Sequence, residues 1–216
     1  MMDSQQLIDE ISREAQFTGD LTGRYRFSDT VMQALKTVPR ECFVADNSMR
    51  NAYLNVPLPI GYGQTISQPY IVALMTDLLD PDSDKTYLEV GTGSGYQAAI
   101  LASLVKQVYS IEVIAALHHS AAELLHRLGY DNVHCILGDG NLGYPQCAPY
   151  DGIIVTACAR KIPAALIEQL NLGGRMIIPV GTPGSRQTLY LIEKSINGKT
   201  SSTPVLGVAF VPLVEP

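Results

Sequence analysis

The sequence is poor in charged residues and carries no pattern of a membrane, secreted or nucleic-acid-binding protein. Asp, Glu, Lys and Arg make up 17% of the 216 residues, below the roughly 25% typical of soluble domains. The net charge of −6 offers no positive excess that could follow a phosphate backbone. Apolar runs end within about ten residues, short of the ~20 that a membrane-spanning helix needs. The polar N-terminus has no signal pattern, so we expect a cytoplasmic protein without nucleic-acid or membrane partners. A monomer is a separate expectation, which no sequence pattern supports.

Several catalytic and metal-binding motifs are also missing. The four cysteines form no C-x-x-C pair, and we interpret them as small buried side chains in a reducing compartment. The histidines lack H-E-x-x-H or any other metal spacing, so no metal is expected. A G-x-S-x-G elbow is absent because Thr92 stands two residues before Ser94. Zinc and serine-hydrolase chemistry are therefore not supported.

Apolar residues are abundant, at 46% of the chain, which is enough for one buried core. In the first third of the chain the periodicity is helical. It predicts a weak helix over 4–15, a loop over 16–27, a helix over 28–37, and another that starts at Pro69. Before Pro69 lies a Gly/Pro-rich stretch, 57–63, that we expect to be a functional loop.

From Thr86 onward, β-branched segments alternate with helical ones, which is typical of a parallel sheet with crossover helices. Asn197-Gly198 then indicates a C-terminal hairpin. We predict a doubly wound, Rossmann-like α/β fold over 81–216, mostly parallel with an antiparallel C-terminal hairpin, and an N-terminal helical cap over 1–80. The expected strands are 86–90, 107–111, 132–136, 151–156, 175–180, 188–193 and 205–213, with helices at 96–105, 114–128 and 162–170.

The strongest local signal is the run Glu89–Gly95 (EVGTGSG), between the first expected strand and its helix. Its glycines let the backbone approach a ligand, and N–H groups at a helix N-terminus suit an anion. Glu112 closes the second strand, where a carboxylate can accept hydrogen bonds from both ribose hydroxyls. Asp139-Gly140 follows the third strand at the same edge. A dinucleotide fingerprint would require glycine at the position of Tyr96, so a nicotinamide cofactor is disfavoured. A plain structural turn remains the alternative.

These residues resemble the S-adenosylmethionine site of class I methyltransferases. Over residues 28–213 the chain resembles the protein-L-isoaspartate (D-aspartate) O-methyltransferase family. Many methyltransferases share the glycine loop, but few share the block Gln64–Tyr70. The matching segments are Val38–Glu41, Phe43-Val44, Leu58–Gly61, Gly63–Tyr70, Gly91–Gln97, Gly138–Gly140, Ala148–Asp151, Ile153–Ala157, Gly173-Gly174, Pro179–Gly181 and Phe210–Leu213.

The resemblance implies a Rossmann-like methyltransferase that transfers a methyl group from S-adenosylmethionine to the α-carboxyl of L-isoaspartyl residues in damaged proteins. S-adenosylhomocysteine is the second product. The ester collapses to a succinimide, which allows return to normal aspartate. Acceptance of D-aspartyl residues is left open. A carboxylate is already ionised near pH 7, so catalysis should come from positioning and exclusion of water.

The resemblance also implies roles for individual residues. Ser67 matches the family's active-site serine, near both substrate and methyl donor, although a serine there could equally be a helix cap. Glu112 would bind the ribose, and Asp139 and Gly140 the adenine region. The other predicted contacts are, for the substrate, Asn55, Thr65 and Ile66, and, for the cofactor, Glu89, Gly91, Thr92, Gly93, Ser94 and Gly95.

The chain departs from the family pattern in three places. Ala45 stands where proline often follows Phe-Val, Val113 replaces a common arginine, and 157–160 lack a proline. Only the last adjoins the expected substrate cleft. Two alternatives remain: a class I methyltransferase with a small-molecule acceptor, and a non-catalytic protein that binds S-adenosylmethionine.

Overall fold

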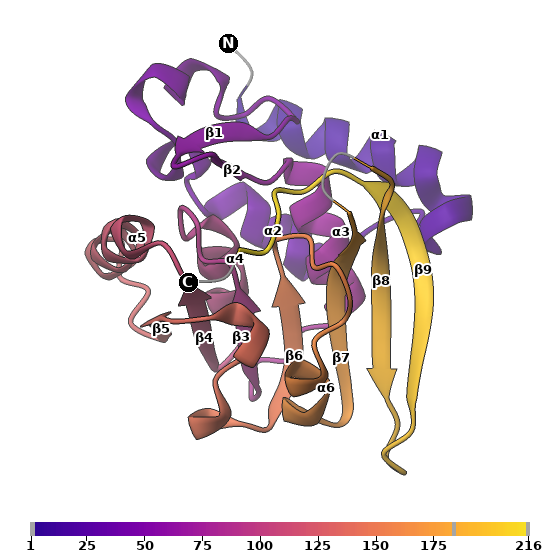
Figure 1. Ribbon diagram of the computed structural model, residues 1–216. Coiled ribbons are helices and arrows are strands. Elements are labelled where there is room, and N and C mark those ends of the chain that lie inside the picture. Colours follow the sequence, from indigo (N-terminus) through magenta and orange to yellow (C-terminus); the bar gives the residue numbers. More distant parts are fainter. Residues whose placement is uncertain (1–2, 183–184, 215–216) are drawn as a thin grey trace.

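The computed structural model describes residues 3–182 and 185–214, and its centre is a seven-stranded sheet in the order β5-β4-β3-β6-β7-β8-β9 (Figure 1). The five strands from β5 to β7 in this order are parallel, and β8 and β9 are antiparallel at the edge. The predicted α/β fold, with its antiparallel C-terminal hairpin, is confirmed. The strands are β3 (Thr86–Val90), β4 (Gln107–Glu112), β5 (Val133–Leu137), β6 (Tyr150–Val155), β7 (Leu170–Gly181), β8 (Gln187–Lys194) and β9 (Thr200–Val208).

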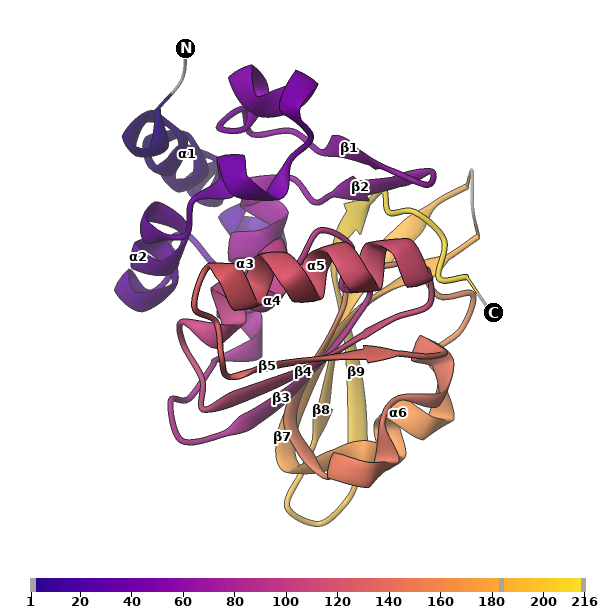
Figure 2. The same cartoon turned by 90° about the vertical axis from the view of Figure 1, so that its left-hand side faces the viewer.

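Helices cover both faces of the sheet. Helices α4 (Tyr96–Ala102) and α5 (Ala115–Arg127) pack on one face, and the short α6 (Ala164–Gln169) packs on the other (Figure 2). Successive residues of a strand point to opposite faces. In β6, Ile154 joins the cluster beneath α4 whereas Ile153 joins the cluster beneath α6. Both are fully buried, which explains why this strand is a continuous apolar run.

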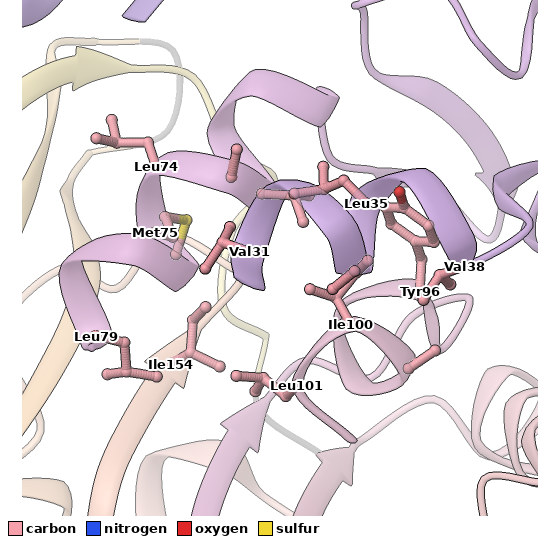
Figure 3. Close-up of a cluster of buried hydrophobic side chains, with 14 of the residues drawn as sticks. Val31, Leu35, Val38, Leu74, Met75, Leu79, Tyr96, Ile100, Leu101 and Ile154 are labelled. Atoms are coloured by element: carbon pink, nitrogen blue, oxygen red, sulfur yellow. The ribbon is translucent and has the colours of Figure 1, made fainter. Parts of the chain in front are cut away.

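The N-terminal helices α1 (Ser4–Thr22), α2 (Asp29–Thr37) and α3 (Pro69–Leu79) lie over the same face as α4. Figure 3 shows Val31 of α2 and Met75 of α3 in one cluster with Ile100 of α4 and Ile154 of β6. The predicted helical cap is therefore joined to the sheet by a shared core. The boundary at residue 80 stays a prediction.

Helix α1 is longer than predicted, because residues 16–22 continue the helix instead of forming a loop. Its buried face includes Ala15, Gly19 and Thr22, which hydropathy alone does not mark as a helical stripe. Position 19 requires glycine, because a Cβ atom there would lie 2.3 Å from the ring of Tyr25. The chain folds back over the helix end, and this contact is not visible in the sequence.

The Gly/Pro-rich stretch before α3 is more regular than the predicted loop. It forms a small antiparallel ribbon of β1 (Leu58–Gly61) and β2 (Gln64–Ile66). Tyr62 and Gly63 make the turn with φ of +54° and +72°, the left-handed conformation that a tight hairpin requires. Tyrosine is unusual there, which hid the turn. Short 3-10 helices precede and follow: η1 (Arg40–Phe43), η2 (Asp46–Asn51), η3 (Gly140–Leu142) and η4 (Pro145–Cys147).

Two further predictions were wrong. Strand β9 covers 200–208 instead of 205–213, because its polar first half pairs with β8 at the exposed edge of the sheet. The chain then crosses above the carboxyl ends of the parallel strands (Figure 1). Of the cysteines expected to be buried, Cys158 is buried, Cys135 and Cys147 are half-buried, and Cys42 is exposed. None of the helices in the described ranges is long and apolar enough to cross a membrane.

Candidate active site

The candidate site lies where the order of the strands reverses. The chain moves outward from β3 to β4 and β5, then returns to place β6 on the other side of β3. In sheets of this kind, ligands bind beyond the carboxyl ends of the strands at this point. The glycine loop follows β3, Glu112 ends β4, and Thr156 follows β6. The topology therefore gathers them at one edge.

The glycine loop is held tightly between β4 and β6. The backbone N–H groups of Gly91 and Thr92 both donate to the carbonyl of Ile111, at 2.8 and 3.1 Å. Thr156 Oγ1 donates to the Gly91 carbonyl at 2.6 Å. Gly91 has φ of +97°, and a Cβ atom there would lie 2.5 Å from Thr156 Oγ1. Only glycine allows the loop to sit this close to β6.

Glu112 anchors the loop from the end of β4. One carboxylate oxygen, Oε2, accepts the Gly93 N–H at 2.8 Å. The other, Oε1, accepts the N–H groups of Val113 and Ile114, both at 3.0 Å. Each carboxylate oxygen has two acceptor sites, so Oε2 still has one for a ligand hydroxyl. Glu112 is 6% exposed, and its carboxylate lines a narrow hollow at this edge of the sheet.

This hollow, which we call the cofactor hollow, is open above the switch point. Glu112 and the glycine loop supply its polar wall, while apolar side chains from β4 and from the chain after β9 supply the other. Such a combination suits a nucleoside, with a polar sugar and a flat apolar base. Its lining comprises Gln64, Thr65, Val90, Gly91, Gly93, Ile111, Glu112, Val113, Ile114, Gly140, Thr156, Ala157, Val211, Pro212, Leu213 and Val214.

A wider cleft of about 690 Å³ adjoins the cofactor hollow. Thr65 and Thr156 line both. Ser67 lines the cleft and also a small cavity beside the glycine loop. The block Gln64–Tyr70 therefore stands between the two spaces. The cleft is lined by Glu14, Pro57, Thr65, Ser67, Gln68, Tyr70, Ile71, Thr156, Ser185, Arg186, Gln187, Leu206, Gly207, Val208, Ala209 and Phe210.

Ser67 is not the cap of helix α3. The N-cap is Gln68, which makes no side-chain capping bond. Instead, Asn55 Oδ1 accepts the Tyr70 N–H at 2.9 Å, so Asn55 serves the helix start. The Ser67 hydroxyl has no hydrogen-bond partner within residues 3–182 and 185–214, which leaves it available at the cleft wall.

The amide of Asn55 also reaches helix α1. Its Nδ2 donates to Glu14 Oε2 at 2.6 Å, and Gln68 Nε2 lies 3.4 Å from the same carboxylate. Burial raises the pKa of Glu14, although these hydrogen bonds oppose the shift. Asn55 is 8% exposed and is not among the lining residues of the cleft. The structure thus places Asn55 behind the cleft wall.

Comparison with known proteins gives the family. The sequence model of the protein-L-isoaspartate(D-aspartate) O-methyltransferase family matches residues 13–216. The chain belongs to this family. A protein-L-isoaspartate O-methyltransferase 2 from Syntrophobacter fumaroxidans is 56% identical over 96% of this chain and 84% of its own length. Another from a Polaromonas species is 51% identical over 96% of this chain and 98% of its own.

Solved structures agree with this assignment. A protein-L-isoaspartate O-methyltransferase superposes with a TM-score of 0.84 at 28% identity, over 97% of this chain and 65% of that one. A Plasmodium falciparum protein whose crystal structure holds S-adenosyl-L-homocysteine gives 0.84 at 23% identity, over the full length of both chains. This second similarity shows that the two chains have the same fold.

The methyltransferase's predicted cofactor residues divide into two groups. Gly91, Gly93, Glu112 and Gly140 line the cofactor hollow. The rest are not among its lining residues. Thr92 is 3% exposed and bonds Ser110 Oγ at 2.6 Å, and Asp139 Oδ1 accepts from Asn141. Of the others, Glu89, Ser94 and the substrate residue Ile66 line the small cavity, while a Cβ on Gly95 would lie 3.1 Å from Leu125.

The sequence did not predict several lining residues. Thr156 could have been found, because it follows a predicted strand at the switch point. Glu14 had no such signal, and Leu213 was marked only as the end of the matching segment Phe210–Leu213, because these two residues come from the two ends of the chain. Only the completed fold brings them to the site.

Glu89 is buried beneath the glycine loop. It is 0% exposed, and Oε2 accepts a hydrogen bond from Ser110 Oγ whereas Oε1 has no partner. Burial raises the pKa of Glu89 to about 8, opposed by the bond from Ser110. The unfolded chain would ionise this group near 4.3, so the folded state binds one more proton between these values. Folding stability from Glu89 therefore falls as pH rises through this window.

We expect Glu89→Gln to remove this contribution, because the amide is neutral at every pH. The melting temperature of the variant relative to the parent should therefore rise between pH 5 and pH 8. Glu168→Gln, an exposed change on α6 at a residue that forms no ion pair within the described residues, is the matched control and should show no such trend. Parallel melting curves of Glu89→Gln and parent over the whole range would contradict the burial argument.

Proposed function

We propose that this chain repairs damaged proteins by methylating the α-carboxyl of L-isoaspartyl residues, with S-adenosylmethionine as methyl donor. The observation that carries the proposal is the shared wall of the two spaces. Thr65 and Thr156 line both the cofactor hollow and the cleft, and Ser67 faces the cleft beside them. A donor in one space and a carboxylate in the other would meet at this wall. Family membership supports the acceptor.

The residues fit the donor. The Gly91 and Gly93 backbone would hold its methionine portion, Glu112 would accept from one of its ribose hydroxyls, and the apolar wall with Gly140 would hold its adenine. A Cβ atom on Gly140 would lie 2.3 Å from the side chain of Val90, so only glycine fits at this position. S-adenosylmethionine supplies a methyl group on a positively charged sulfur that a carboxylate oxygen can attack.

The chain's own task is to orient the acceptor. A carboxylate is ionised near pH 7, so no general base is needed. The hydroxyls of Ser67 and Thr65 can each donate a hydrogen bond to it without removing its charge. Fixing the acceptor in line with the donor and excluding water from the cleft would supply most of the acceleration.

The test compares two peptides that differ only in linkage. The chain is incubated with radiolabelled S-adenosylmethionine and an isoaspartyl peptide or its normal aspartyl twin, and base-labile methyl ester is counted. Label in the first peptide alone supports the proposal. Label in small carboxylates alone would favour another acceptor, and cofactor binding without product would favour a non-catalytic role. A D-aspartyl twin tests the second acceptor. The monomeric state and cytoplasmic location stay predictions from sequence.

The chain also carries a site of the damage it would repair. Asn197 and Gly198 are exposed in the β8–β9 turn, and Gly198 has φ of +76°. Without a side chain on Gly198, its backbone nitrogen can attack the side-chain carbonyl carbon of Asn197 and expel ammonia, which forms a succinimide. Water then opens this ring largely to isoaspartate. We expect aged protein to accumulate isoaspartate at Asn197 and to accept methyl groups from fresh enzyme. Mass spectrometry of aged parent and Asn197→Gln checks this. Equal methylation of both aged samples would contradict the expectation.

A further inference from the structure

The segment Val38–Glu41, one of those that match the family pattern, has no part in the site described so far, yet it contains the most deeply buried cation of the described residues. Arg40 lies in η1 and is 0% exposed. Removing a guanidinium from water costs several kcal/mol unless partners compensate. No carboxylate within residues 3–182 and 185–214 forms an ion pair with it. Arginine stays charged in proteins, so other groups must hold this charge.

The guanidinium connects three separate parts of the chain. Its Nη2 donates to the Ser67 carbonyl at 2.7 Å, and its Nε donates to the Ala52 carbonyl at 3.0 Å. Its Cζ lies 4.8 Å from the ring centroid of Tyr96, within range of a cation–π interaction. Tyr96 is the first residue of α4, directly after the glycine loop. Arg40 thus touches the substrate block and the cofactor loop's helix at once.

Ser67 needs such a tie because no regular element fixes it. Strand β2 ends at Ile66 and helix α3 begins at Pro69. Ser67 therefore lies outside the ladder of the ribbon and outside the hydrogen bonds of the helix. The bond from Arg40 fixes its carbonyl, and with it the direction in which the Cβ and hydroxyl leave the backbone.

We propose that Arg40 is a positioning residue for methyl transfer, which holds Ser67 at a fixed place relative to the glycine loop. This rests on the proposed function. Arg40 cannot touch substrate, since it is fully buried, so it acts through Ser67 and Tyr96. The planar fork is essential, because two donors in fixed directions reach two carbonyls while the charged carbon Cζ lies over the Tyr96 ring. Lysine offers a point charge on a flexible stem and cannot do all three.

The test measures kcat and KM for the isoaspartyl peptide in Arg40→Lys and Arg40→Met. Because a displacement of about 1 Å can cost up to ~100-fold in rate, we expect kcat to fall at least about tenfold in both, with less change in KM. Arg24→Met is the matched control. Arg24 lies away from the site, and its Nε forms an ion pair with Asp77 Oδ2 at 2.8 Å. Loss of this ion pair should lower the melting temperature but not kcat.

A second measurement does not depend on activity. Hydrogen exchange of the amides over 64–68 should speed up in Arg40→Lys, whereas exchange in the buried middle of α3 should match the parent. If the parent fails to methylate the isoaspartyl peptide, the proposed function is wrong. Hydrogen exchange over 64–68 still tests whether Arg40 holds the Ser67 segment in place. Folded Arg40→Lys with parental kcat, or with parental exchange over 64–68, would overturn the positioning role even if the variant melts earlier.

Discussion

Ser67→Ala should lower kcat for the isoaspartyl peptide by about 100- to 1,000-fold, because loss of one well-placed donor in comparable sites costs about 2.7–4 kcal/mol. Ser67 lines the cleft, and its hydroxyl has no partner among the described residues. Cofactor affinity should change little, since Glu112 and the glycine loop are not touched. Turnover and calorimetric affinity on one preparation measure both effects.

A true helix cap provides the control for Ser67. Ser28 is the N-cap of α2, and its hydroxyl accepts the Val31 N–H at 3.4 Å. Ser28→Ala should cost about 1 kcal/mol of folding stability and leave kcat at the parental value. If Ser67→Ala behaves in the same way, with a lower melting temperature and unchanged turnover, the serine has no part in orienting the carboxylate.

Glu112→Ala should weaken binding of S-adenosylmethionine by about ten- to 100-fold. A hydrogen bond to a charged group contributes about 1.5–3 kcal/mol, and about 1.4 kcal/mol corresponds to a factor of ten. A ribose hydroxyl would lose its acceptor. In addition, the N–H groups of Gly93, Val113 and Ile114 would lose theirs, so the glycine loop itself would shift.

The measurement is calorimetric titration of folded variants with S-adenosylhomocysteine, which avoids turnover. Glu112→Gln should fall between parent and Glu112→Ala, because its amide oxygen can serve only part of the four acceptor demands. Glu123→Ala, an exposed change on α5, should bind as the parent does. Parental affinity in folded Glu112→Ala would show that the carboxylate is structural and does not hold the ribose.

Much of the fold could be predicted because its signals are local. β-branched runs alternate with helical stretches, and a parallel sheet follows from that order. The sequence missed elements whose signals are weak or unusual. The second half of α1 depends on Gly19 packing against Tyr25, and the β1–β2 turn places Tyr62 at positive φ. In both cases a tertiary contact or turn geometry overrides composition.

The candidate site divides along the same line. The sequence by itself predicted the glycine loop and Glu112, because each is a short segment at a predicted strand end, and it predicted Ser67 through the resemblance of the block Gln64–Tyr70 to the family. Only the tertiary structure decided that Asn55 supports helix α3, that Glu14 enters the cleft, and that Arg40 ties Ser67 to Tyr96. The hydrogen bonds and the ring contact among these join residues from 15 to 56 positions apart in the sequence. No periodicity or spacing encodes them, because they depend on how the completed elements pack against each other.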